Sequence, residues 1–161
     1  MGNFAVLPLR TKVRGPAYPP ASADQYDILD EIIDLFRVNS FFRNFEIKGP
    51  ADRTLIYGIL FVSDCLSKLK PSTTSQEANR LLNTLAIDHF ALPGEPGFPL
   101  NALYTAPRDR TEVEFLRSYL SQFRQELALR LIDKIYAEDP KLPNKYWLAF
   151  TRRRFMNLSL S

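Results

Sequence analysis

The sequence predicts an all-α fold: a multihelical single domain in which one central buried helix is surrounded by the others. Apolar residues recur three or four positions apart through most of the chain, which is the period of a helix with one buried face. The run from Leu55 to Val62 is apolar on every side, as expected for a helix that other helices enclose. The length of 161 residues, with 45% hydrophobic and 24% charged residues, fits one globular domain spanning 1–161.

Residues 1–23 predict an extended basic arm, because prolines remove backbone donors and forbid a continuous helix at positions Pro8, Pro16, Pro19 and Pro20. Ser22 followed three residues later by Gln25 is a capping-box pattern, so we expect the first helix to start there and to end near Asn39. Its apolar face consists of Ile28, Leu29, Ile32, Ile33 and Phe36.

Gly49-Pro50 predicts the entry of a second helix that runs to about Lys70, before Pro71. Its composition would also suit a buried strand, but the apolar pattern continues through Leu69 and is longer than a typical strand. A polar turn over residues 72–76 then precedes a third helix that ends near Asp88.

Residues 90–108 predict a long Pro/Gly-rich loop, in which Gly94 and Gly97 each follow a proline, as type II turns prefer. Such a loop in a compact domain is usually functional or packed as a unit. After it, the spacing predicts the longest helix, from Asp109 or Thr111 to about Ala137. A final short helix carries aromatic residues at Tyr146, Trp147 and Phe150.

Charge is distributed unevenly along the chain. Residues 1–23 contain Arg10, Lys12 and Arg14 without any acid, and the basic C-terminal segment 141–161 contains five basic residues without any acid. All 18 acidic residues therefore lie between these ends, which favours an acidic partner: nucleic acid, lipid headgroups or protein. No uncharged run approaches the ~20 residues that span a bilayer, so we expect a soluble, cytoplasmic protein without a membrane partner.

The sequence offers little for catalysis. The single cysteine, Cys65, lies in the apolar helix, and the single histidine, His89, is better interpreted as a capping or packing residue than as a general base. The carboxylate pairs, Glu112 with Glu114 and Glu138 with Asp139, lie in solvated surroundings without an apolar run to shift a pKa. We therefore expect no enzymatic activity, no metal and no cofactor.

Two binding hypotheses remain open at this point. Aromatic residues interleaved with basic residues at the C-terminal end, Tyr146, Trp147, Phe150 and Phe155, would suit single-stranded nucleic acid, or would be core residues. Phe98 and Leu100 on a stiff loop would be anchors for a protein partner, or would pack back against the fourth helix. A basic helical nucleic-acid-binding module is therefore the alternative function.

Several strings resemble the subunit 3 family of the actin-related protein 2/3 complex, the branch nucleator of actin. They are Gly2-Asn3 with Leu7-Pro8, Phe41-Phe42 with Glu46-Ile47-Lys48, the strings 51–57 (ADRTLIY) and 93–102 (PGEPGFPLNA), Arg124-Gln125-Glu126, and 154–157 (RFMN). The resemblance covers nearly the whole chain, and its loop string is highly specific. Family members generally carry a further short segment before the Gly-Asn pair, so we expect the arm to be truncated here.

The resemblance implies a structural, non-catalytic subunit at the actin cytoskeleton. Its implied partners are actin-related protein 3, the other subunits of a seven-subunit complex, and the actin filament. Because nucleotide is bound by the actin-related subunits, none is expected here. The candidate partner interface comprises two groups: loop residues Pro93, Glu95, Phe98 and Leu100, and basic residues Lys145, Arg152, Arg153 and Arg154.

The basic end gives a first testable prediction. Exposed charges at an interface act mainly on association rate and its salt dependence, so Arg152→Glu with Arg153→Glu should slow branch formation most at low ionic strength. The purified complex should stay intact. Branching rates measured across salt concentrations test this. Identical rates for variant and wild type would mean that these arginines have only a structural role, as solvated residues that interact favourably with the C-terminal dipole of a helix.

Overall fold

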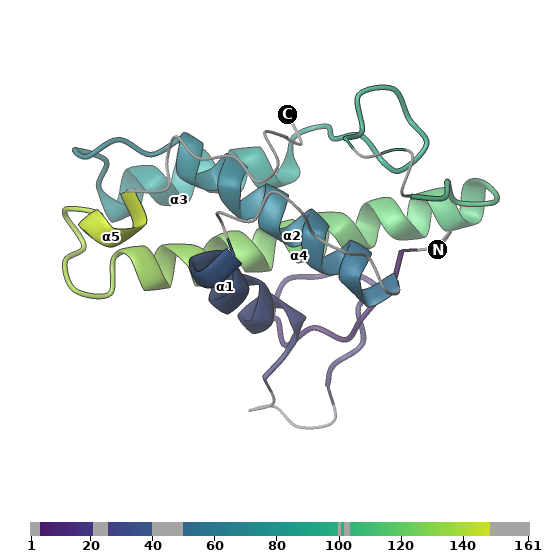
Figure 1. Cartoon of the computed structure of the whole chain (residues 1–161), viewed down its shortest axis with the longest axis horizontal. Helices are drawn as coiled ribbons and strands as arrows, with labels where there is room; N and C mark the ends of the chain where they lie inside the picture. Colours follow the sequence, from purple (N-terminus) through teal and green to yellow (C-terminus); the bar gives the residue numbers. More distant parts are fainter. Residues whose placement is uncertain (1–3, 21–25, 40–49, 100, 102–103, 149–161) are drawn as a thin grey trace.

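The computed structural model describes residues 4–20, 26–39, 50–99, 101 and 104–148, and shows a helical fold (Figure 1). The helices are α1 (Ile28–Asn39), α2 (Pro50–Ser67), α3 (Ser75–Ile87), α4 (Arg110–Ile135) and α5 (Lys145–Leu148). No strand occurs in these described ranges, which confirms the all-α prediction. None of the helices described is long and apolar enough to cross a membrane.

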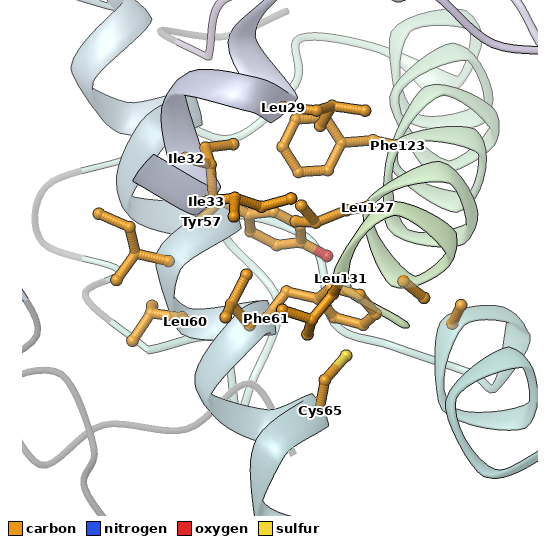
Figure 2. Close-up of a cluster of buried hydrophobic side chains, with 14 of the residues drawn as sticks. Leu29, Ile32, Ile33, Tyr57, Leu60, Phe61, Cys65, Phe123, Leu127 and Leu131 are labelled. Atoms are coloured by element: carbon orange, nitrogen blue, oxygen red, sulfur yellow. The ribbon is translucent and has the colours of Figure 1, made fainter. Parts of the chain in front are cut away.

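Helix α2 is the buried centre of the fold. Every residue from Thr54 to Leu66 is buried, and α2 packs against both α1 and α4. Figure 2 shows Tyr57 and Phe61 directed towards the α4 residues Leu127 and Leu131. The prediction of a central enclosed helix is confirmed, with Tyr57, Ile59, Leu60 and Cys65 all between 0% and 1% exposed, and the strand alternative is wrong.

The second helix ends earlier than predicted. It stops at Ser67, because the N–H groups of Lys68 and Leu69 bond carbonyls only three residues back, at 3.1 Å each. This tighter final turn satisfies carbonyls that the helix end would otherwise leave without a partner.

A glycine allows α1 and α2 to approach closely. A Cβ atom at Gly58 would lie 2.2 Å from Cδ1 of Ile32 on α1, much closer than atoms can pack. Any larger residue would therefore force the Ile32 side chain, and α1 with it where the side chain cannot turn aside, to move. The entropic cost of a helical glycine is offset here by helix packing.

The first helix starts at Ile28, so the prediction of a start near Ser22 is wrong, although Ser22 and Gln25 themselves lie outside the described residues. The cap is Asp27, whose Oδ1 accepts the N–H groups of Leu29 at 3.0 Å and Asp30 at 3.2 Å. Its Oδ2 accepts the backbone N–H of Arg10 at 2.9 Å. Asp27 is thus held by contacts outside the helix, which fixes the helix start.

The described part of the arm, residues 4–20, packs against the helices. Tyr119 of α4 bonds both backbone groups of Leu7, donating to the carbonyl at 2.7 Å and accepting from the N–H at 3.0 Å. The Gln122 amide donates to the Val13 carbonyl and accepts from the Ala17 N–H, each at 2.9 Å. Phe4 and Leu9 enter the core. Helix α4 therefore supplies side-chain partners to a backbone that forms no helix.

Arg130 joins the arm, α1 and α4. Its guanidinium pairs with Asp27 and lies 3.2 Å from Asp30 and 3.6 Å from Glu126, and it also donates to the Arg10 carbonyl. Burial acts to raise the pKa of Asp27, but bonds to Arg130 and to two backbone N–H groups outweigh burial and hold the pKa below its ordinary value of 3.8.

The starts of α3 and α4 also have side-chain caps. Thr74 accepts the N–H of Glu77 at 3.2 Å at the start of α3, and Asp109 accepts the N–H of Glu112 at 2.9 Å at the start of α4. The fourth helix ends at Ile135, two residues before the expected Ala137. The apolar stripe whose spacing predicts this helix is buried at Leu116, Leu120, Phe123, Leu127, Leu131 and Ile135, and its first residue, Val113, is half-buried.

Leu60→Ala should lower the free energy of unfolding by about 2 to 5 kcal/mol, because it removes buried methyl groups and leaves a cavity. Urea denaturation measures the loss. The matched control is Leu142→Ala at a leucine that is 54% exposed, which should change stability by less than about 0.5 kcal/mol. A loss below about 1 kcal/mol for Leu60→Ala would contradict the buried placement.

The Asp27 cap predicts a pH dependence of stability. Because the folded pKa is lowered, the contribution of the carboxylate is present above its unfolded pKa and is lost as the pH falls through the folded one. Asp27→Asn should therefore lower the free energy of unfolding by about 1 to 3 kcal/mol near pH 7. The loss should not be larger, because Arg130 still has Asp30 and Glu126 as ion partners.

Urea denaturation between pH 3 and pH 7 tests this, and the difference between variant and wild type should shrink below about pH 4. Asp133→Asn, at an exposed acid on α4, is the control and should leave the pH profile unchanged. A constant difference across the range would contradict the assignment.

Candidate partner interface

The Pro/Gly-rich loop is anchored by Phe98. This side chain is 5% exposed; its ring stacks on Tyr57 of α2, with centroids 6.2 Å apart, and meets Tyr104 edge-on at 5.0 Å. The placement corresponds to the packing alternative, with ring partners on α2 and within the loop. Pro93 is also buried. These two candidate interface residues therefore face the interior.

The backbone of the loop is fixed by turns and by one asparagine. Gly94 and Gly97 have φ angles of 94° and 88°, in the left-handed region that type II turns require at this position. The Asn101 side chain accepts the Gly94 N–H at 2.8 Å and donates to the Glu95 carbonyl at 2.9 Å. The turns over residues 92–98 therefore have a defined shape without a bound partner.

Glu95 connects the loop to α4. Its carboxylate lies 3.2 Å from Arg117, and Arg117 also donates to the Phe90 carbonyl at 2.8 Å. The same carboxylate accepts the Leu92 N–H at 2.6 Å. Glu95 thus has a structural role, while the neighbouring Pro96 and Gly97 are the exposed edge of the loop.

The entry to the loop depends on Arg124, a cation only 3% exposed. Its guanidinium donates to the carbonyls of Leu85 at 2.7 Å and Ala86 at 3.2 Å, at the end of α3, and to the Tyr57 hydroxyl at 3.1 Å. Its central carbon lies 4.4 Å from the ring centroid of Phe90 and 4.7 Å from that of Phe61. One side chain therefore joins α2, α3, α4 and the first loop residue.

The C-terminal candidates are only partly described. Lys145 is exposed at the start of α5, whereas Leu100, Arg152, Arg153 and Arg154 lie outside the described residues. Trp147 is 4% exposed and stacks on Phe36 of α1 at 6.4 Å. Base stacking needs an accessible ring, so the prediction of a stacking surface is wrong for Trp147. Phe150 and Phe155 also lie outside the described residues.

The residues considered for catalysis lie on different elements, with Cys65 on α2, His89 after α3 and Glu112 on α4. Cys65 is fully buried, and burial raises the pKa of its thiol, so the reactive thiolate is disfavoured. His89 is exposed and follows Asp88, the cap of α3, so the expectation of a packing or capping histidine is wrong. Glu112 pairs with Arg108 at 3.2 Å. Within the described ranges, no group of three or more His, Cys, Asp or Glu side chains could hold a metal ion.

Sequence reasoning missed the two arginines that position the loop, Arg117 and Arg124. Arg124 follows Leu120 by four positions and precedes Leu127 by three, so it lies on the apolar face of its helix. An arginine on an apolar stripe indicates a buried, paired cation. The partners themselves are carbonyls and rings far away in sequence, which no local pattern reveals.

Phe98→Ala should cost about 3 to 5 kcal/mol of stability, because it removes a buried ring and its aromatic contacts. Urea denaturation measures the loss, and Tyr18→Ala, at a tyrosine that is 59% exposed, is the control. If Phe98 acts only by packing, the variant should still enter its complex at low temperature. A near-neutral effect on stability, with lost assembly, would instead indicate direct partner contact.

Comparisons with known proteins agree over nearly the whole chain. The family model described as "P21-Arc: ARP2/3 complex ARPC3 (21 kDa) subunit" matches residues 1–160. Similar proteins include actin-related protein 2/3 complex subunit 3 of Saccharomyces cerevisiae, 59% identical over 99% of this chain and 90% of the relative. The subunits 3 of Schizosaccharomyces pombe, 57% identical (99% and 90%), and Dictyostelium discoideum, 44% identical (99% and 91%), are further examples. The chain therefore belongs to the P21-Arc family of ARP2/3 complex ARPC3 subunits.

Proposed function

We propose that this chain is the structural subunit 3 of an ARP2/3 complex, and that it supports the nucleation of branched actin filaments by binding actin-related protein 3 and the filament. In this role the chain binds other subunits and catalyses no reaction. The carrying observation is the family match over residues 1–160. As part of an actin nucleator, the chain works at the cytoplasmic actin cytoskeleton.

The contact with actin-related protein 3 is assigned to the exposed edge of the loop, Pro96 and Gly97. The rest of the loop is held by Phe98, by Asn101 and by the Glu95–Arg117 pair. A segment that is already ordered loses little conformational entropy on binding, so its contacts contribute more fully to affinity. Of the loop candidates named from sequence, Pro93, Glu95 and Phe98 therefore support the interface from inside, and Leu100 remains a candidate contact.

The filament contact is assigned to the basic end, Lys145 with Arg152, Arg153 and Arg154. Lys145 is exposed, and residues 141–161 carry no acid. A positive field of this kind attracts an acidic polymer surface and raises association rates. It complements the loop edge, which is uncharged at Pro96 and Gly97.

Affinity purification of the tagged chain tests the complex as a whole. After nuclease treatment, mass spectrometry should recover both actin-related proteins and the other subunits at equal stoichiometry. A chain that loses its partners on nuclease treatment would instead be a nucleic-acid-binding module. Recovery of the chain alone would contradict the proposed function.

Pro96→Trp tests the loop edge. A bulky ring on an exposed, rigid edge should block close packing and weaken binding to the remaining subunits by at least about tenfold, or 1.4 kcal/mol. The matched control is Pro71→Trp, at an exposed proline between α2 and α3, which should bind like wild type. Circular dichroism and thermal melting should show both variants folded. Wild-type affinity of Pro96→Trp would exclude this edge from the interface.

A further inference from the structure

A hollow of about 660 Å³ lies where the arm, the end of α3 and the middle of α4 meet. Residues from all three segments line it: Arg14, Ile87, His89, Arg117, Ser118 and Ser121. Phe90, the first loop residue, also lines it, so this surface is continuous with the loop. We call it the arm hollow.

The arm hollow is rich in hydrogen-bond donors. Arg14 is exposed and forms no ion pair with any residue of the described ranges, in contrast to Arg10, which pairs with Asp30 at 3.3 Å. The exposed imidazole of His89 and the hydroxyls of Ser118 and Ser121 add further donors. The Ser121 hydroxyl accepts the Gln125 amide at 3.1 Å, which leaves its own proton for a ligand.

The charge balance favours a single carboxylate over a dense cluster of phosphates. Arg117 also lines the arm hollow, but its guanidinium is already paired with Glu95 at 3.2 Å. Asp88 lies at the same surface, so the arm hollow has no large excess of positive charge and a multiply charged phosphate group would be repelled there. Arg14 is therefore the cation that remains for a ligand among the described lining residues, which matches one negative side chain.

The edge of the arm hollow is apolar. Ile87, the last residue of α3, is 55% exposed, and Phe90, which also lines the arm hollow, is 7% exposed. An exposed branched apolar side chain next to an unpaired arginine fits a partner segment in which an acidic residue neighbours an apolar one. Both features lie beside the loop already assigned to partner contact.

We infer that the arm hollow docks an acidic side chain with an adjacent apolar side chain from a neighbouring protein subunit of the complex. Arg14, His89 and the two serines bind the carboxylate, and Ile87 packs against the apolar neighbour. This inference rests on the proposed function, because it identifies a second contact surface of the same assembled subunit. It adds a polar, charge-selective contact to the uncharged loop edge.

The experiment measures binding of the full chain to the complex that lacks subunit 3, at several salt concentrations. Arg14→Glu should weaken binding by about tenfold at low salt and less at high salt, because it replaces attraction by repulsion. Ile87→Asp should weaken binding at all salt concentrations. Lys12→Glu is the matched control: it makes the same charge change on an exposed residue of the same arm, outside the arm hollow, and should change affinity less than about twofold.

The outcomes separate the hypotheses. Wild-type affinity for both Arg14→Glu and Ile87→Asp would overturn the docking site while leaving the proposed function intact. Equal losses of affinity for Lys12→Glu and Arg14→Glu would overturn the docking site, because the effect would then come from the overall positive charge of the arm. Binding to phosphatidylserine vesicles that Arg14→Glu abolishes, with assembly unchanged, would assign the hollow to a membrane surface and overturn the inference. Failure of the wild-type chain to bind the complex would overturn the proposed function, and this inference with it.

Discussion

The burial of one cation, Arg124, determines how the helices and the loop meet. Removing a guanidinium from water costs several kcal/mol unless its donors find partners. Here two carbonyls at the end of α3 and the Tyr57 hydroxyl accept its N–H groups, and the rings of Phe61 and Phe90 contact its faces. Because all these partners are needed together, the end of α3 and the entry to the loop have a fixed place on α4.

Tyr57 extends this constraint to the arm and the loop. Its ring stacks on Phe98, and it contacts Phe4 of the arm edge-on at 5.7 Å and Phe123 of α4 at 6.0 Å. Figure 2 shows this ring in the space between α2 and α4. The central helix therefore does more than fill the core, because its Tyr57 ring contacts both the arm and the loop and helps to hold them in place. Arm and loop depend on the same buried ring.

The fold also decides which basic residues form ion pairs and which do not. Arg10, Arg117 and Arg130 form ion pairs that hold the arm and the loop to the helices, and of these pairs only Arg130 with Asp27 is largely buried. Lys12, Arg14 and Lys145 stay exposed. Charges without an ion partner contribute most to the field that attracts other molecules, whereas paired charges mainly hold segments in place. The basic residues of the arm therefore divide into Arg10, which pairs with Asp30, and Lys12 and Arg14, which form no ion pair within the described ranges.

The sequence by itself determined the helical class, the enclosed second helix and the apolar stripe of α4, because these follow from periodicity, which is a local property. It also indicated the turns at Gly94 and Gly97, since positive φ is a property of single residues. It could not determine that Asp27 and not Ser22 caps α1, because Asp27 is fixed by Arg130, 103 residues away. Nor could it determine that Phe98 points inward and His89 outward. Only the tertiary structure decided these positions, because each depends on which distant ring, carbonyl or charge lies opposite, and that is set by how the helices pack.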